Sequence, residues 1–169
     1  MATRMTVSAN YGTHLPCLIK AMSHSTGDVL ELGMGVFSTP YLHYQSIISN
    51  RKLTSYDNNH GWAQWFIKYG YLHPYHEIIA VDNYDDAKIE KEWDVVLIDH
   101  SPIERRTIDS RRLANWAKYL IIHDTSENGE KEHHLSEIYP LFKYKLVYDK
   151  DKFQATILSN FISLDNFWE

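Results

Sequence analysis

Short apolar runs rich in β-branched residues alternate along the chain with longer segments of helical period. The runs recur about every 20 to 25 residues, and four of the first five end in Asp. A continuous run such as VVLI suits a strand that is covered on both faces, so these five predict a parallel sheet wrapped by helices. The expected strands are DVLELG (28–33), KLTSYD (52–57), HEIIAVD (76–82), WDVVLID (93–99) and KYLIIHD (118–124).

Segments between these runs predict the helices. Thr39 and Pro40 have the residue types of an N-cap and a first turn. Trp62, Phe66 and Tyr69 recur on one face of the next helix. A helix over about 102–118 should bury Ile108, Leu113 and Trp116 and leave outside the arginines Arg105, Arg106, Arg111 and Arg112.

The pattern changes at the end of the chain. YKLVYD (144–149) and FQATILSNF (153–161) are separated by only three residues, which is too short for a crossover helix, so they predict an antiparallel hairpin. Leu135, Ile138 and Phe142 indicate a last helix before the hairpin. Residues 11–22 indicate one further helix before the first strand. The chain is therefore expected to be a three-layer α/β sandwich over 1–169, with 1–27 as an N-terminal cap.

Composition narrows the class of protein. A chain of 169 residues with 44% hydrophobic and 23% charged residues fits one globular domain. The net charge of −5 provides no general attraction to nucleic acid or to an anionic membrane. Cys17 stands alone, so no disulfide can form within the chain. No apolar stretch has the length of a membrane helix, and residues 1–10 lack a signal-peptide core, so a cytoplasmic protein is expected.

The stretch VLELGMGVFSTP, residues 29–40, carries the first candidate chemistry. Gly33 and Gly35 would let the loop after the first strand bring its N–H groups close to a ligand. Glu31 beside the loop favours a ligand with positive charge. Asp57 ends the second strand, where a carboxylate can accept ribose hydroxyls. Ser38 stands where nicotinamide-dinucleotide binders usually carry a third glycine, which argues against that cofactor.

In this set of motifs the chain resembles the class I S-adenosylmethionine-dependent methyltransferases. The resemblance rests on LELGMG, SYDNN, AVDNYDD and VVLIDHSP at the ends of four successive strands, and on the terminal hairpin. It covers about residues 11 to 161. It implies a Rossmann-like, mostly parallel seven-stranded sheet whose seventh strand lies antiparallel between the fifth and the sixth.

The resemblance also implies roles for particular residues. Glu31, Gly33 and Gly35 would surround the methionine part of S-adenosyl-L-methionine, and Asp57 with Asn58 would hold the ribose. Asp82 or Asn83 would approach the adenine. The expected cofactor-binding residues are Tyr11, Glu31, Gly33, Gly35, Ser38, Asp57, Asn58, Asp82 and Asn83.

Methyl transfer to oxygen needs alignment of the acceptor and removal of one proton. Asp99 and His100 end the fourth strand, and His123 and Asp124 end the fifth, so these four are the candidate catalytic residues. Either histidine could be the base, or either could be structural. A divalent metal held by Asp99 and Asp124 is less favoured, because Thr125 replaces the asparagine of the metal-dependent branch.

Three functions remain in competition. The first is O-methylation of a small-molecule or sugar-type acceptor. The arginines of residues 104–112 are expected to form a solvated helix face, and their alternative role is to bind an anionic acceptor. The second is a nicotinamide-dependent oxidoreductase, and the third is a non-catalytic protein that binds S-adenosylmethionine for regulation. A nucleic-acid acceptor is not expected, and a homo-oligomer is compatible with the sequence.

Overall fold

A single mixed sheet organises the chain in the computed structural model, which describes residues 7–169 except the side chains of residues 128 and 133. The strand order is β3-β2-β1-β4-β5-β7-β6. Strands β1 to β5 are parallel to one another, and β7 pairs antiparallel with both β5 and β6. The strands are β1 (Val29–Leu32), β2 (Leu53–Asp57), β3 (His76–Ala80), β4 (Trp93–Ile98), β5 (Ala117–His123), β6 (Tyr144–Tyr148) and β7 (Ala155–Ser159).

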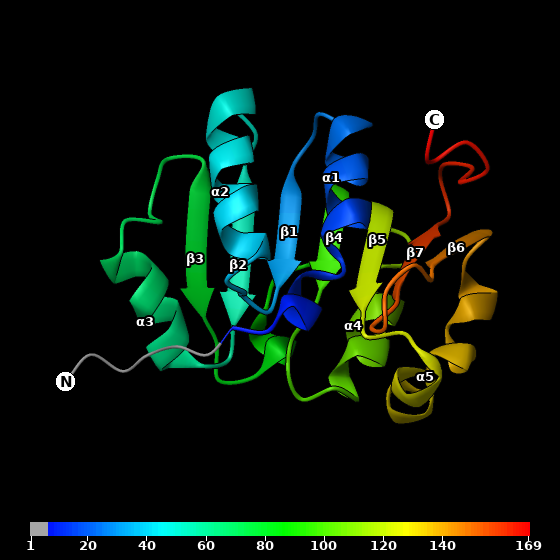
Figure 1. Cartoon of the computed structure of the whole chain (residues 1–169). Coiled ribbons are helices and arrows are strands. Elements are labelled where there is room, and N and C mark those ends of the chain that lie inside the picture. The colour runs from blue at the N-terminus through cyan, green and yellow to red at the C-terminus, as the bar shows by residue number, and fades with distance from the viewer. Residues whose placement is uncertain (1–6) are drawn as a thin grey trace.

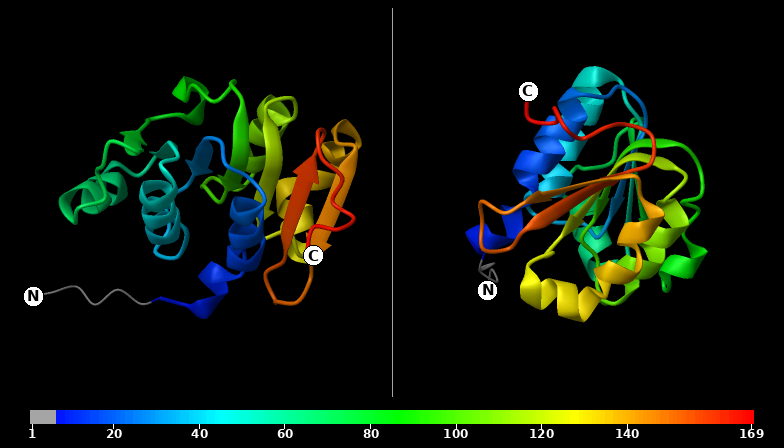
Figure 2. Two further views of the ribbon diagram at one scale, coloured as in Figure 1. Left: turned by 90° about the horizontal axis from the view of Figure 1, so that it is seen from above. Right: turned by 90° about the vertical axis from the view of Figure 1, so that its right-hand side faces the viewer.

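Helices cover both faces of this sheet. Helices α1 and α2 lie on one face, and α4 with the turns after α5 lies on the other (Figures 1 and 2). The α-helices are α1 (Leu15–Ser23), α2 (Ser38–Ser49), α3 (His60–Lys68), α4 (Arg105–Leu113) and α5 (Glu127–His133). Short 3-10 turns are η1 (Ala9–Gly12), η2 (Tyr84–Asp86), η3 (Leu135–Glu137) and η4 (Tyr139–Leu141). The three-layer sandwich, the seven-stranded sheet and the antiparallel hairpin are confirmed.

Side chains of each strand alternate between the two layers, and this alternation positions the site. In β4, Val95 and Leu97 join a buried cluster with Leu18 of α1. Val96 and Ile98 point the other way, into the cluster that contains Leu113 of α4. Successive residues of a strand face opposite sides of the sheet. The same alternation places Asp99 and His100, which follow β4, on opposite faces of the sheet.

Two helical predictions need correction. Helix α2 begins at Ser38 with Phe37 as N-cap, so Thr39 lies inside the helix, where its hydroxyl is used by the glycine loop. Leu113 of helix α4 is buried as predicted. Ile108 is half exposed and Trp116, which follows the helix, is 39% exposed, so the prediction that both are buried is wrong. Arg106, predicted to lie outside, is only 4% exposed. The reason is electrostatic, because carboxylates and carbonyl groups at the strand ends draw this arginine inward.

The segment before the hairpin also differs from a continuous helix. The short helix α5 ends before the turns η3 and η4, yet Leu135, Ile138 and Phe142 are buried as their spacing suggested. The segment before β1 forms the turn η1 and then α1, which packs against β4 and β5. Among residues 7–169, none of the helices combines the length and the hydrophobicity of a membrane-spanning segment.

Candidate active site

Gly33 lies where the loop after β1 passes directly over the end of β4. Its φ is +91°, which L side chains rarely adopt. A Cβ at this position would lie 2.5 Å from the backbone nitrogen of His100 and 2.6 Å from the carbonyl carbon of Asp99. The close approach that requires this glycine is therefore to another part of the chain. At Gly35, a Cβ would meet only the Oγ of Ser38, at 3.1 Å.

Glu31 is connected to this loop by hydrogen bonds through Thr39. It is fully buried and accepts hydrogen bonds from Ser55 Oγ at 2.6 Å and from Thr39 Oγ1 at 2.9 Å. Thr39 Oγ1 in turn accepts the N–H of Gly35 at 2.9 Å. Burial raises the pKa of Glu31 to about 7, although the hydroxyl hydrogen bonds counteract this shift. Glu31 therefore reaches the glycine loop through a threonine and is not exposed to the surface.

Asp57 fixes the same loop from the neighbouring strand β2. Its Oδ2 accepts the N–H of Met34 and its Oδ1 accepts the N–H of Asn59, each at 2.8 Å. Its carboxylate therefore faces the glycine turn, but Asp57 is buried to 6% exposure. Burial raises the pKa of Asp57, and the two backbone N–H groups counteract this shift. Each carboxylate oxygen retains a further acceptor position.

A cleft of about 400 Å³ opens beside this loop, at the carboxyl ends of the strands. One wall is mostly apolar and aromatic, and the other carries charged groups from the ends of β4 and β5 and from α4. The residues that line it are Val7, Tyr11, Met34, Gly35, Val36, Phe37, Trp62, Asp99, Arg106, His123 and Asp124. Five of the residues predicted for the site, Tyr11, Gly35, Asp99, His123 and Asp124, therefore meet at one cleft.

Asp99 and His123 form a hydrogen-bonded pair at the polar wall. Asp99 Oδ1 accepts the His123 Nδ1–H at 3.0 Å, and His123 Nε2 contacts Thr13 Oγ1 at 2.8 Å. Burial by itself would raise the pKa of Asp99, but the hydrogen bond from His123 and the charge of Arg106 hold it below its ordinary value. Asp99 is therefore an ionised group that orients the imidazole.

Arg106 links the ends of the two strands. Its Nη2 lies 3.1 Å from Asp99 Oδ1, and its Nη1 lies 3.6 Å from Asp124 Oδ2. It also donates to the backbone oxygens of His100 at 2.8 Å and His123 at 2.9 Å. One buried guanidinium thus neutralises part of the negative charge that the two carboxylates bring to the cleft.

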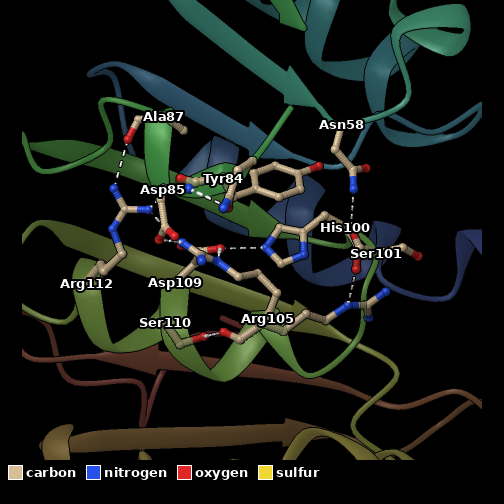
Figure 3. Close-up of polar contacts among 12 residues, drawn as sticks. Asn58, Tyr84, Asp85, Ala87, His100, Ser101, Arg105, Asp109, Ser110 and Arg112 are labelled. Atoms are coloured by element: carbon tan, nitrogen blue, oxygen red, sulfur yellow. Dashed lines mark hydrogen bonds and ion pairs between the residues drawn. The ribbon is translucent and has the colours of Figure 1, made fainter. Parts of the chain in front are cut away.

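His100 is not among the residues that line the cleft. Its ring lies between Tyr84 and Asp109 of α4 (Figure 3). It is 1% exposed, its Nε2 contacts Asp109 Oδ2 at 3.0 Å, and its ring lies on that of Tyr84 at 4.2 Å. Arg105 and Arg112 both pair with the same Asp109. The expectation that His100 stands beside the acceptor is corrected, because strand alternation turns it toward α4 while Asp99 faces α1.

The remaining predicted residues lie outside the cleft. Asn58 donates to the Ser101 backbone oxygen at 2.9 Å and so ties the loops after β2 and β4 together. Asp82 is exposed and pairs with His60 at 2.8 Å, and Asn83 caps the turn η2. Ser38 is buried in the first turn of α2. The expectation of four outward arginines fails, since Arg105 and Arg112 are engaged with Asp109.

Two residues of the segment before α1, Thr13 and His14, lie at the site although they are not among the predicted site residues. Thr13 contacts His123, and His14 is 1% exposed with its Nδ1 3.9 Å from Asp99 Oδ2. Neither ring nitrogen of His14 has a hydrogen-bond partner among the described residues. Burial lowers the pKa of His14 to about 4, although Asp99 counteracts this shift. The only signal in the sequence was the polar YGTH before an apolar helix.

The fold matches that of solved structures of other proteins. Neither a protein-family model nor a curated protein sequence matches the chain. Among solved structures, cofactor-bound Rv0187 from MTB matches with a TM-score of 0.66 and 15% identity, over 94% of this chain and 84% of that one. The SAM-dependent O-methyltransferase TM0748 from Thermotoga maritima matches with a TM-score of 0.63 and 14% identity, over 94% and 68%.

A third match is to an RNA-bound protein. The hMettl16 catalytic domain in complex with the MAT2A 3'UTR hairpin 1 has a TM-score of 0.64 and 10% identity, over 94% of this chain and 72% of that one. At these identities the likeness concerns the fold. Together with the strand order and the antiparallel β7, it shows that the chain has the class I S-adenosylmethionine-dependent methyltransferase fold.

Proposed function

We propose that the protein is an S-adenosylmethionine-dependent methyltransferase that acts on a hydroxyl group of a small acceptor. The observation that supports this most is the continuity of the cleft. It joins a glycine loop braced by Asp57 to the Asp99–His123 pair, on a fold shared with methyltransferases. A nucleoside bound at the loop would bring its reactive end toward an ionised carboxylate and an imidazole.

The cofactor would lie along the loop between β1 and α2. Met34 and Gly35 line the cleft and would pack against its methionine part, although their N–H groups are already bonded to Asp57 and Thr39. Asp57 beside Met34 would accept ribose hydroxyls. Phe37 and Trp62 offer aromatic faces to the adenine or the acceptor. A cationic sulfonium is favoured near Asp99, while a pyrophosphate would be repelled there. This charge preference weighs against the nicotinamide alternative.

His123 is the proposed general base. Because its Nδ1–H donates to Asp99, the basic nitrogen of the neutral ring is Nε2, which contacts the Thr13 hydroxyl at 2.8 Å. An acceptor hydroxyl that replaced the Thr13 hydroxyl would stand at the distance needed for proton transfer. Asp99 would stabilise the imidazolium that forms, and the methyl group would pass in line to the oxygen.

The charges at the cleft favour an acceptor without a phosphate or carboxylate. Arg106 is the cationic side chain that lines the cleft, and it is already engaged by Asp99 and Asp124. Because Asp99 and Asp124 already neutralise Arg106, this arginine gives no reason to expect an anionic acceptor. The fold itself is compatible with both acceptor classes, since the matched proteins include an O-methyltransferase and an RNA-bound catalytic domain.

The decisive experiment has two stages. Calorimetric titration with S-adenosylmethionine, S-adenosylhomocysteine and NAD in parallel should show binding of the first two alone. Transfer of labelled methyl groups should then be measured to hydroxylated small molecules and to short hairpin RNA. Binding of NAD alone would contradict the proposal. Binding of S-adenosylmethionine without transfer to any member of the panel would instead favour a regulatory protein.

A further inference from the structure

His14 is a buried histidine for which the fold supplies no partner. Its side chain is 1% exposed at the start of α1, and neither ring nitrogen makes a hydrogen bond within the described part of the chain. A buried polar group without a partner is unfavourable, because it has lost its hydrogen bonds to water and gained none in return. An unsatisfied buried group in a native fold calls for an explanation, and a bound ion is one of the common ones. The nearest acidic atom is Asp99 Oδ2, at 3.9 Å from His14 Nδ1.

That separation is too long for a hydrogen bond and fits two ligands of one ion. Metal–nitrogen and metal–oxygen bonds near 2.1 Å hold neighbouring ligand atoms about 3 to 4 Å apart. His123 completes the group, because one ligand atom from each of His14, Asp99 and His123 lies within 4.8 Å of the others. We propose that these three residues bind a divalent transition-metal ion at the wall of the cleft.

The neighbours of the three ligands are arranged as a metal site requires. His123 and Arg106 both contact Asp99 Oδ1, so Oδ2 is the oxygen that faces His14. Thr13 holds the other nitrogen of His123, which fixes the orientation of the ring. The ligands come from the start of α1 and from the ends of β4 and β5, so the site exists only in the folded chain.

The donor set selects the type of ion. Two imidazoles and one carboxylate suit Zn²⁺, Co²⁺, Fe²⁺ or Ni²⁺, whereas Mg²⁺ and Ca²⁺ prefer oxygen ligands. Arg106 beside Asp99 partly neutralises the carboxylate, which weakens the attraction for Mg²⁺ or Ca²⁺. The imidazole nitrogens are unaffected, so the preference for a transition-metal ion is strengthened. The arrangement differs from a metal held by Asp99 and Asp124, which the sequence did not favour, because Asp124 does not belong to the group.

Metal binding goes beyond the proposed methyl transfer, since the site needs neither nucleoside nor acceptor. Asp99 and His123 line the cleft, so open coordination positions would face the acceptor. A hydroxyl that coordinates a divalent ion loses its proton more easily. With the ion bound, His123 would coordinate through Nδ1 and carry its proton on Nε2, toward Thr13. The ion, in place of His123, would then lower the pKa of an acceptor hydroxyl, and the hydroxyl proton would pass to solvent.

The test is titration of the full chain with Zn²⁺ or Co²⁺ in the absence of any nucleoside. Calorimetry should show one ion per chain, and Mg²⁺ and Ca²⁺ should give no comparable heat. His14→Gln should weaken the binding of Zn²⁺ by more than about 100-fold, beyond the range expected for an outer-shell partner. His60→Gln, which changes an exposed histidine, should leave it unchanged. Equal affinity in His14→Gln and the wild type would overturn the proposal, as would the absence of binding.

A second measurement covers the case in which His14→Gln fails to fold. In wild-type protein with ¹⁵N-labelled histidine, Zn²⁺ should shift the ring signals of two of the ten histidines. His43 and His76, whose Nδ1 atoms lie 2.9 Å apart, are the competing pair. The shifts should therefore persist in His76→Gln. Loss of both shifts in that variant would assign the ion to the other pair. Because no nucleoside is present, the result stands apart from that of the methyltransferase test.

Discussion

The backbone nitrogen of His100 lies 2.5 Å from the position that a Cβ on Gly33 would occupy. Gly33→Ala should therefore destabilise the protein through two effects, the positive φ and the collision with the end of β4. The strain alone costs about 1–3 kcal/mol. Chemical denaturation should show a larger loss, with the loop after β1 displaced.

Gly70 provides a matched control. It has the same φ of +91° but nothing within 4 Å of its Cβ position. Gly70→Ala should lose only the stability that the strained φ costs. The additional loss of unfolding free energy in Gly33→Ala then measures how tightly the loop packs on Asp99 and His100. Equal losses of stability in the two variants would show that the close approach of Gly33 to the backbone of His100 does not contribute to stability.

Glu31 should make stability depend on pH between 4.5 and about 7, the interval between its ordinary and its folded pKa. A carboxyl whose pKa is raised by folding stabilises the folded state while it is protonated. This contribution is complete below pH 4.5 and is lost as the pH rises through about 7. The full interval corresponds to ~3 kcal/mol.

Glu31→Gln tests this prediction, because an amide keeps the hydrogen-bonding shape without titrating. The free energy of unfolding of wild type and variant should be compared at closely spaced pH values. Relative to the variant, the wild type should lose stability as the pH rises through this interval. A constant difference would show that Glu31 stays ionised throughout.

Asp57 should contribute to cofactor binding. Asp57→Ala removes acceptor positions for ribose and the brace on the Met34 N–H, so affinity for S-adenosylmethionine should fall by about 1–3 kcal/mol. Calorimetric titration gives this value directly. Asp82→Ala is the comparison, since Asp82 is exposed and pairs with His60. A larger effect at Asp82 than at Asp57 would move the nucleoside toward β3.

The two strand-end histidines should behave differently. His123→Gln should slow methyl transfer by about 100-fold or more while sparing cofactor affinity, because a general base contributes 10²- to 10⁴-fold. His100→Ala should leave the rate per folded molecule intact and lower stability by about 2–4 kcal/mol, since it removes a buried ring and its contact with Asp109. Single-turnover rates and thermal unfolding separate the two effects. A rate loss in His100→Ala with unchanged stability would contradict this assignment.

The strands were predictable because their signal is local. Continuous apolar runs ended at acidic residues, and five parallel strands with a hairpin followed from run length and spacing. Helix faces were less predictable. Arg106 was expected outside because arginines usually are, yet tertiary contacts with Asp99 and two strand-end carbonyls bring it inside.

Strand alternation could have separated the catalytic candidates. Asp99 and His100 are adjacent in sequence, so they had to face opposite layers, and only Asp99 shares a face with His123. Thr13 and His14 carried no comparable signal. They lie 110 and 85 residues from the side chains they meet, His123 and Asp99 respectively.

The sequence by itself determined the order of elements, the glycine loop and the acids at the strand ends, because strand periodicity and turn chemistry act between residues close in the chain. Only the tertiary structure decided that Gly33 accommodates the backbone of His100, that Glu31 lies beneath the loop, and that His14 meets Asp99 and His123. Those contacts depend on how the segment before β1 folds back over the sheet. Local propensity does not specify such long-range packing.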